Sequence, residues 1–193
     1  MKNKLYYLVL VLILGLSFNL YAGSINNIVK EKKLSQQEID KISLFLSNFT
    51  EVRLYNFDIE NYDEQRVLDF GIEHNYLNNK NSKIKDAGKA GYLILIDDIN
   101  ESIKKYFGID YKNEYNDKNS GYTFKTYEHE VNYVKVEKVF DKGNGELYCE
   151  GKLYNINHKD YLFGYVKAII KKSKYKDKDV YNLIELKSDG IEE

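Results

Sequence analysis

The chain has 193 residues, 43% of them hydrophobic, and a formal charge of −1. This near-neutral charge does not favour a polyanionic partner. Only two arginines, Arg53 and Arg66, are available for the bidentate contacts to phosphates and bases that arginine makes best. We therefore expect no nucleic-acid partner.

The first 22 residues have the layout of a secretory signal peptide. Lys2 and Lys4 precede an apolar run over 5–18, and Ala22 then supplies a small residue at a cleavage position. This run is short against the roughly 18 to 20 residues needed to span a bilayer. We predict cleavage and an extracytoplasmic product, periplasmic or secreted, with an uncleaved anchor helix as the alternative. A lipid anchor is not expected, because no cysteine stands at the processing site.

The remaining length of about 170 residues suits one domain with a full hydrophobic core. We predict a flexible lead over 23–33 and a single α+β domain over 34–190. The lone cysteine, Cys149, excludes an internal disulfide. Alternation along the surrounding strand places it on an apolar face with Leu147 and Leu153, so we expect a buried, inert thiol.

The first predicted helix covers about 36–48. Ser35 and Glu38 have the spacing of a capping box, and Leu34 with Ile39 fits a hydrophobic staple. The core stripe at helical spacing consists of Ile39, Ile42, Leu46 and Phe49.

Two further helices and a short strand follow. The second helix is predicted over about 63–79, after an acidic connector. An apolar strand over 92–96 then leads directly into a third helix, for which Asp98 is the expected cap, Glu101 its box partner and Gly108 the left-handed stop.

From about residue 121 the hydrophobic period changes from 3.6 to 2, which indicates strands. Short loops separate them, and Asp141–Gly145 fits a hairpin turn. We therefore expect an antiparallel meander with about three helices packed on one face, an α+β arrangement. The expected strands cover 121–127, 132–140, 146–156, 161–172 and 180–187.

The segment Phe70–Asn79, with its F-x-I-x-H-N-Y-x-N pattern, the segment Asp97–Gly108 and the tyrosine-rich meander resemble bacterial proteins of no known activity that carry a signal peptide or a lipid anchor. The order of elements also resembles the cystatin and NTF2-like group. That resemblance implies a curved sheet that wraps helices around a conical pocket, and it fixes no function, because such folds host enzymes, binding modules and inhibitors.

His74 is the candidate acid or base. On a helical projection it lies between Phe70, Gly71 and Leu77, on the side that we expect to face the sheet. A histidine in a pocket can exchange a proton near pH 7. The alternative is a core histidine whose nitrogens bond to asparagine or tyrosine.

Two patterns imitate metal sites without meeting their requirements. In the first, Glu128–Glu130, His129 lies between two glutamates. Neighbouring residues of a strand point to opposite faces, so His129 cannot share an ion with either glutamate. In the calcium-loop-like stretch from Asp117 to Glu128, Tyr122 occupies the sixth position, where glycine permits the sharp turn. We predict no metal and no cofactor.

Aromatic residues alternate with apolar ones along the last strands, which predicts an aromatic outer face on the sheet. Rings set among charged residues are typical of an interface or of a stacking platform for sugars or peptides. The alternative is a scatter of tyrosines in a chain that contains 19 of them. The candidate binding residues are Tyr148, Tyr154, Tyr161, Phe163, Tyr165 and Tyr181.

The chain contains no CxxC, HExxH or GxSxG motif that would select a reaction. We predict an exported, non-enzymatic binding domain for a protein, peptide or cell-wall glycan, with no stable membrane anchor after cleavage. Its aromatic face could also join two copies of the chain in a homodimer. The alternatives are an NTF2-like pocket enzyme that uses His74, and a cystatin-like protease inhibitor with Asp141–Gly145 as its wedge.

Overall fold

The computed structural model describes residues 30–78, 84–111, 120–125, 131–158 and 161–189. It divides the chain into two compact units, Met1–Lys30 and Glu31–Glu193, and the second unit contains all the elements below. The predicted signal peptide and most of the predicted lead lie outside the described residues. No helix in the described ranges is long and apolar enough to cross a membrane.

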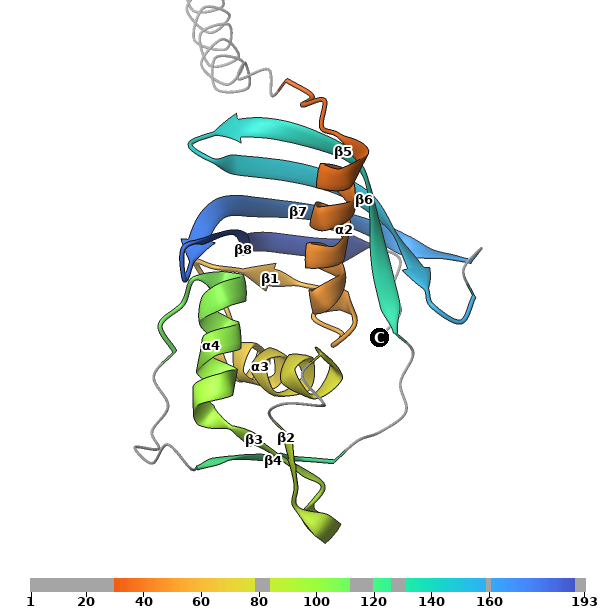
Figure 1. Cartoon of the computed structure of the whole chain (residues 1–193). Helices are drawn as coiled ribbons and strands as arrows, with labels where there is room; N and C mark the ends of the chain where they lie inside the picture. The colour runs from red at the N-terminus through yellow and green to blue at the C-terminus, as the bar shows by residue number, and fades with distance from the viewer. Residues whose placement is uncertain (1–29, 79–83, 112–119, 126–130, 159–160, 190–193) are drawn as a thin grey trace, which may run out of the picture. The chain divides into compact units, whose positions relative to one another are not determined.

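The second unit has three described helices and two antiparallel sheets, which confirms the predicted α+β class (Figure 1). The helices are α2 (Gln36–Thr50), α3 (Glu64–Asn78) and α4 (Ile96–Phe107). The five-stranded sheet has the order β1 (Phe57–Asp58), β8 (Lys178–Asp189), β7 (Leu162–Tyr175), β6 (Glu146–Asn155) and β5 (Asn132–Gly143). The three-stranded sheet has the order β2 (Ile84–Asp86), β3 (Tyr92–Leu95) and β4 (Gly121–Phe124), and a 3-10 turn covers Gly88–Ala90.

The meander consists of β5 to β8, and β4 is not part of it. The sequence predicted a first meander strand at 121–127, but β4 pairs with β3 in the smaller sheet, where Gly121 lies opposite Leu95. A Cβ on Gly121 would come within 2.3 Å of the carbonyl oxygen of Ile94. Glycine therefore permits this close pairing. The predicted hairpin at Asp141–Gly145 is confirmed between β5 and β6.

Helix α2 begins and packs as the sequence predicts. The Ser35 hydroxyl accepts a hydrogen bond from the Glu38 N–H, and the Glu38 carboxylate accepts one from the Ser35 N–H, so the capping box is complete. Three hydroxyls then bind the backbone of the neighbouring edge strand β5. Those of Ser43 and Ser47 accept the N–H groups of Val136 and Val134, and that of Thr50 donates to the carbonyl of Asn132. These bonds hold α2 across the sheet.

Helix α4 begins two residues earlier than the predicted cap. Its N-cap is Leu95, with no side-chain cap, and Asp98 lies in the first turn together with Asp97. The buried Ile96 donates its N–H to the carbonyl of Ser120, so β3 continues into the helix without a polar cap. The carboxylates of Asp97 and Asp98 still stabilise the helix, because they lie at the positive end of its dipole.

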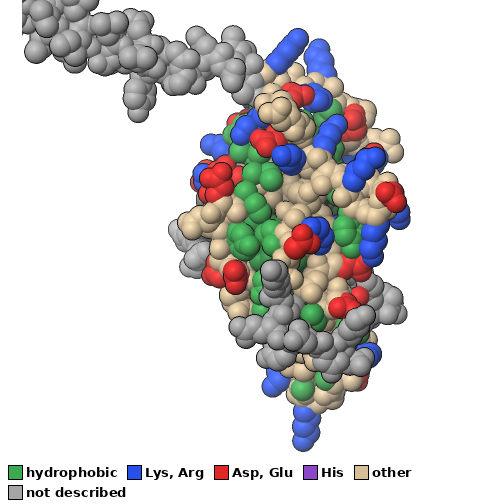
Figure 2. Space-filling model, turned by 90° about the vertical axis from the view of Figure 1, so that its left-hand side faces the viewer, with side chains coloured by type: hydrophobic (Ala, Val, Ile, Leu, Met, Phe, Trp, Pro, Cys, Tyr) green, Lys and Arg blue, Asp and Glu red, His purple; other side chains and the backbone are tan. Residues whose placement is uncertain are grey.

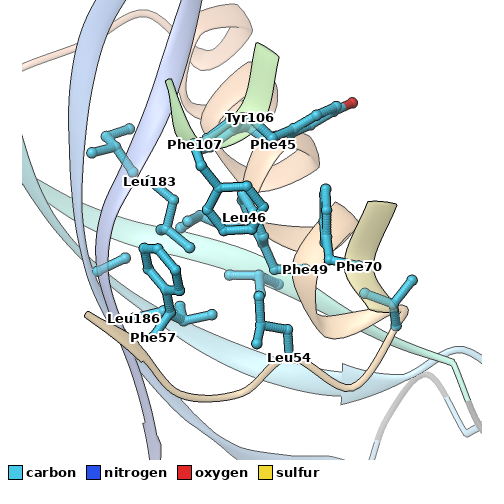
Figure 3. Close-up of a cluster of buried hydrophobic side chains, with 14 of the residues drawn as sticks. Phe45, Leu46, Phe49, Leu54, Phe57, Phe70, Tyr106, Phe107, Leu183 and Leu186 are labelled. Atoms are coloured by element: carbon cyan, nitrogen blue, oxygen red, sulfur yellow. The ribbon is translucent and has the colours of Figure 1, made fainter. Parts of the chain in front are cut away.

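Aromatic side chains from all three helices meet in the core above the five-stranded sheet (Figure 3). Helix α2 lies across that sheet, α4 contacts β8, and α3 packs against α4 (Figure 1). A Cβ on Gly71 would lie 2.7 Å from Ile99 Cγ2, so the α3–α4 contact is close. The expectation that all three helices pack on one sheet face is therefore wrong for α3. The labelled core residues are Phe45, Leu46, Phe49, Leu54, Phe57, Phe70, Tyr106, Phe107, Leu183 and Leu186.

Candidate functional site

A cavity of about 340 Å³ lies where α2, α3 and α4 meet the turn between β7 and β8. Its walls come from four elements that are far apart in the sequence. The lining residues are Asn48, His74, Asn78, Glu101, Ser102, Lys105, Tyr106, Tyr175, Lys176 and Lys178.

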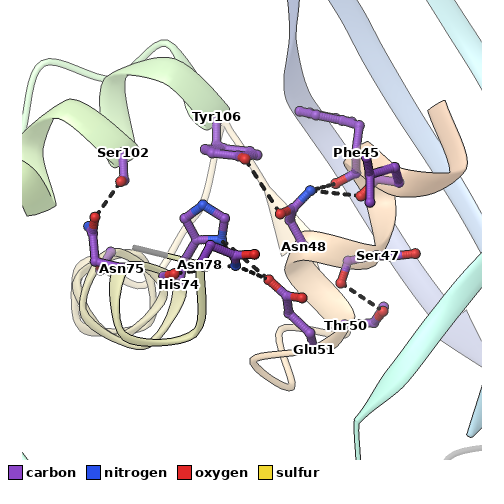
Figure 4. Close-up of polar contacts among 12 residues, drawn as sticks. Phe45, Ser47, Asn48, Thr50, Glu51, His74, Asn75, Asn78, Ser102 and Tyr106 are labelled. Carbon is purple, nitrogen blue, oxygen red and sulfur yellow. Dashed lines mark hydrogen bonds and ion pairs between the residues drawn. The ribbon is translucent and has the colours of Figure 1, made fainter. Parts of the chain in front are cut away.

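His74 is buried at the inner wall of this cavity, with 4% of its surface exposed. Its Nδ1 lies 3.4 Å from Glu51 Oε1 and 3.0 Å from Asn78 Nδ2, and the Asn78 amide also donates to Glu51 at 2.6 Å (Figure 4). Nδ1 can accept from Asn78 when it lacks a proton and can donate to Glu51 when it carries one. Both ring tautomers of His74 thus have a hydrogen-bonding partner at Nδ1.

Packing on both sides fixes the plane of the His74 ring. It stacks on Phe70 with 5.1 Å between centroids and a 4° interplanar angle, and it meets Tyr106 edge-on at 4.5 Å. The expectation that His74 faces the sheet is wrong, because α3 packs on α4 and the ring consequently lies between α2 and α4. Next to it, Asn75 donates to Ser102 Oγ at 2.9 Å and to the Asp98 carbonyl at 3.0 Å, which ties α3 to α4.

Tyr106 stands over His74 and points its hydroxyl toward Asn48, whose Oδ1 lies 3.4 Å away (Figure 4). Burial, and to a smaller degree the nearby Glu51 carboxylate, raise the pKa of Tyr106 to about 12. Tyr106 therefore keeps its proton at neutral pH and presents a neutral hydrogen-bonding hydroxyl.

Lysines give the cavity an excess of positive charge. Lys176 pairs with Glu101, which also accepts a hydrogen bond from the Tyr175 hydroxyl at 2.9 Å. Lys105 and Lys178, in contrast, form no ion pair with any carboxylate of the described residues. Burial, and then the charge of Lys178, lower the pKa of Lys105. Lys105 and Lys178 thus place two like charges on the cavity wall, where the Lys105 ammonium lies over the Tyr106 ring, 4.8 Å from its centroid.

A second hollow, of about 240 Å³, adjoins the first between α2, α4 and β8. It shares Asn48, Lys105 and Tyr106 with the first. We call it the apolar groove, and its other lining residues are Lys41, Leu44, Phe45, Asp179, Val180 and Tyr181. On the side of the molecule that carries α4 and the β7–β8 turn, hydrophobic side chains gather in a strip among lysines and acidic side chains (Figure 2).

The outer face of the five-stranded sheet carries part of the predicted aromatic surface. Tyr154 stacks on Tyr133 with 5.6 Å between centroids, and Tyr165 is 54% exposed. At the other end, Tyr148 lies beside Phe140 at 5.8 Å. Between these two groups the strand register aligns charged residues, namely Lys138, Glu150, Lys167 and Lys187. The rings therefore form two clusters instead of one continuous row.

Tyr161 lies just before β7 and is 64% exposed. It lies outside the helices and strands, and its N–H donates to the carbonyl of His158. It therefore belongs to the connection that leads into β7 and not to the regular face of the sheet.

Two predicted outer-face residues point elsewhere, because β-bulges interrupt the alternation. In β8 the register passes from Glu185 to Leu183 across a bulge, so Tyr181 lies on the helix-covered face, 5.7 Å from the ring of Phe45. In β7 a bulge skips Phe163, which is half-buried and packs against the core. The predicted outward placement of Tyr181 and Phe163 is thus wrong, since a bulge reverses the faces of the residues beyond it.

The remaining candidates do not assemble into a site. Cys149 is buried and free, as predicted, and burial raises its pKa to about 12. The stretches 128–130 and 117–119 lie outside the described residues, and His158 is exposed in a turn. The described ranges contain no group of three or more histidine, cysteine, aspartate or glutamate side chains that could hold a metal ion.

Sequence reasoning found His74 but missed Glu51, which contacts His74, and the cavity residues Lys105, Tyr106 and Lys178. A usable signal existed for Tyr106, because it follows Ile99 by seven residues and Ile103 by three and so shares their helical face. Lys178 carried no comparable signal, since it joins the site through the β7–β8 turn. Comparisons with models of protein families, with curated proteins and with solved structures found no match.

Proposed function

We propose that this chain is an exported binding domain whose ligand places an anionic group in the His74 cavity. The observation that carries this proposal is the pair Lys105 and Lys178, which share the cavity wall without a carboxylate partner among the described residues. An anion between them would replace a like-charge repulsion with two charge-assisted hydrogen bonds.

Neutral hydrogen-bonding groups surround the two lysines. Tyr106, Asn48, Asn78 and Ser102 also line the cavity, and each can donate or accept a hydrogen bond. A few polar groups that converge on a concave site are typical of ligand recognition. The partner classes expected from the sequence, a protein, a peptide or a cell-wall glycan, can all carry a carboxylate.

The geometry favours this cavity over the outer sheet face. Charged residues divide the outer rings into two clusters, and two lysines of that face are already paired, Lys152 with Glu137 at 2.7 Å and Lys187 with Glu185. Tyr148, Tyr154 and Tyr165 remain a second surface for a partner or for another copy of this chain.

Export and the finer fold are part of the proposal. The charged and apolar layout of residues 1–22 supports export, and the buried, unpaired Cys149 is compatible with an oxidising compartment. A helix across an antiparallel meander, as α2 lies across β5–β8, supports a cystatin or NTF2-like architecture.

The proposal is tested with N-acetylglycine, a small carboxylate, and its neutral amide as the control ligand. We expect N-acetylglycine to shift the backbone amide NMR signals of Lys105 and Tyr106, with a dissociation constant in the millimolar range. The double variant K105M/K178M should lose these shifts, while K167M, which removes an exposed lysine of the outer face, should keep them. Shifts that are absent, or that survive in K105M/K178M, would contradict the proposal.

One observation favours acid–base catalysis by His74 as a second candidate function. The ring nitrogen opposite Nδ1 points toward Tyr106 at the cavity, while Glu51 lies at Nδ1 (Figure 4). A carboxylate behind a histidine is the arrangement that orients a general base. Hydrolysis of p-nitrophenyl acetate is a simple probe, and a rate that does not fall in His74→Asn would remove this candidate.

A further inference from the structure

The polar cavity and the apolar groove share one wall, and this wall determines what can occupy both. Lys105, Tyr106 and Asn48 line each hollow. A ligand that extends from one to the other must therefore pass these three side chains. Its polar part would face Lys178 on one side, and its apolar part would face Phe45 and Tyr181 on the other.

The lining and the size of the apolar groove are suited to bind one apolar side chain. The Phe45 ring stacks parallel to Tyr106 at 5.9 Å and lies 5.7 Å from Tyr181. Leu44 at the edge is 69% exposed, although it is large and hydrophobic. The volume of about 240 Å³ is below the roughly 300 to 1,000 Å³ of sites for drug-sized ligands. It suits a phenylalanine or leucine side chain better than a long acyl chain.

Charge specifies the polar end of the ligand. Lys41 and Lys105 line the groove against one acid, Asp179, and Lys178 adds a further positive charge in the adjoining cavity. Asn48 Oδ1, which is 3.4 Å from the Tyr106 hydroxyl, can accept an additional N–H donor at the junction. A carboxylate, an N–H group and an apolar side chain are all present on the last residue of a peptide.

We propose that the two hollows together bind the C-terminal residue of a peptide. Its free carboxylate lies at Lys105 and Lys178, its N–H donates to Asn48, and its apolar side chain fills the groove. This inference rests on the proposed function, because it assigns the anionic group to a peptide terminus.

The test compares three peptides by isothermal titration calorimetry: N-acetyl-Gly-Gly-Phe as the free acid, the same peptide as its C-terminal amide, and N-acetyl-Gly-Gly-Gly as the free acid. We expect the phenylalanine acid to bind about tenfold tighter than either of the others, since each lacks one anchor. Equal affinity of the acid and the amide would overturn the inference, as would equal affinity of the phenylalanine and glycine acids.

Two variants separate the anchors. K105M should abolish the preference for acid over amide, and Leu44→Ser should reduce the preference for phenylalanine over glycine. Leu44 is exposed, so its replacement should leave the fold intact, which circular dichroism checks. K167M is the matched control and should bind all three peptides as the unchanged protein does.

The outcomes also separate this inference from the proposed function. If N-acetylglycine binds at Lys105 and the phenylalanine side chain adds no affinity, the peptide inference fails and the anion-binding function stands. If neither N-acetylglycine nor any of the peptides binds, both fail.

Discussion

The two faces of the five-stranded sheet differ in how their charges are satisfied. On the outer face Lys152 pairs with Glu137 and Lys187 pairs with Glu185, and each side chain comes from a strand of the sheet. On the helix-covered side, Lys105 and Lys178 come from a helix and from the start of a strand, and neither forms an ion pair with a carboxylate of the described residues. A regular surface can balance its charges locally, whereas an imbalance arises where separate elements converge. The site where these separate elements come together is therefore better suited to bind a ligand than the outer face.

The largest difference between the two faces should appear in how much a substitution on each of them lowers the stability of the chain. Phe49 is fully buried and contacts the rings of Phe45, Phe70, Tyr106 and Phe107. We expect Phe49→Ala to lower the free energy of unfolding by about 3 to 5 kcal/mol in urea titrations, through lost burial and a residual cavity. The outer-face control Tyr154→Ala should cost about 1 kcal/mol or less. Similar losses in both variants would show that the core does not lie under the helices.

Histidines offer a second matched comparison. His74→Ala removes a buried ring and leaves Glu51 and Asn78 without their partner at Nδ1. The expected cost is about 2 to 3 kcal/mol, against about 0.5 kcal/mol or less for His158→Ala in its exposed turn. Thermal and urea unfolding measure both. A tolerated His74→Ala would contradict its role as a packed, bonded wall of the cavity.

Alkaline pH probes the same wall. The pKa of Tyr106 is raised from 10 to about 12 in the folded chain, so the unfolded chain releases this proton first. The stability that the buried, protonated Tyr106 contributes is fully present below pH 10. Roughly 1 to 2 kcal/mol of it is lost as the pH rises toward 12. Urea midpoints at pH 8 and pH 11 should fall less in Tyr106→Phe than in the unchanged protein. An equal fall would contradict the buried position of this hydroxyl.

The smallest expected effect concerns Lys105. Lys105→Met removes the positive charge that repels Lys178. It should therefore raise the free energy of unfolding by up to about 0.5 kcal/mol at low salt. Its helical neighbour is a suitable control, because Lys104→Met loses an ion pair with Asp110 and should not stabilise the chain. The gain should shrink as salt is added. A loss of stability in Lys105→Met would mean that the contact of its ammonium with the Tyr106 ring, 4.8 Å from the centroid, outweighs the repulsion from Lys178.

Periodicity predicted the regular parts of this molecule well. The capping box at Ser35 and Glu38, the left-handed stop at Gly108 and the four long meander strands depend on neighbouring residues, and all are confirmed. The start of α4 was misplaced, because burial of Ile96 outweighed the local capping signal of Asp98.

The candidate site was harder to predict, because it depends on contacts between distant elements. His74 was identifiable as a histidine on an apolar helix face, but its contact with Glu51 requires α2 and α3 to meet. Tyr181 was assigned to the wrong face, since one bulge near Ile184 reverses the alternation and nothing in the local sequence marks it. Bulges and helix crossings determine which side chains reach this site, and both depend on tertiary packing.

The hydroxyls that α2 presents to β5 have a consequence for assembly. An edge strand offers free backbone groups to which another extended chain can add. Here Ser43, Ser47 and Thr50 occupy such groups between Asn132 and Val136, and farther along the strand Lys32 donates its N–H to the carbonyl of Val139. A partner strand could join β5 only after displacing α2. This side of the sheet is thereby protected from the edge-to-edge growth that leads to aggregation, and the protection is supplied by side chains of the helix.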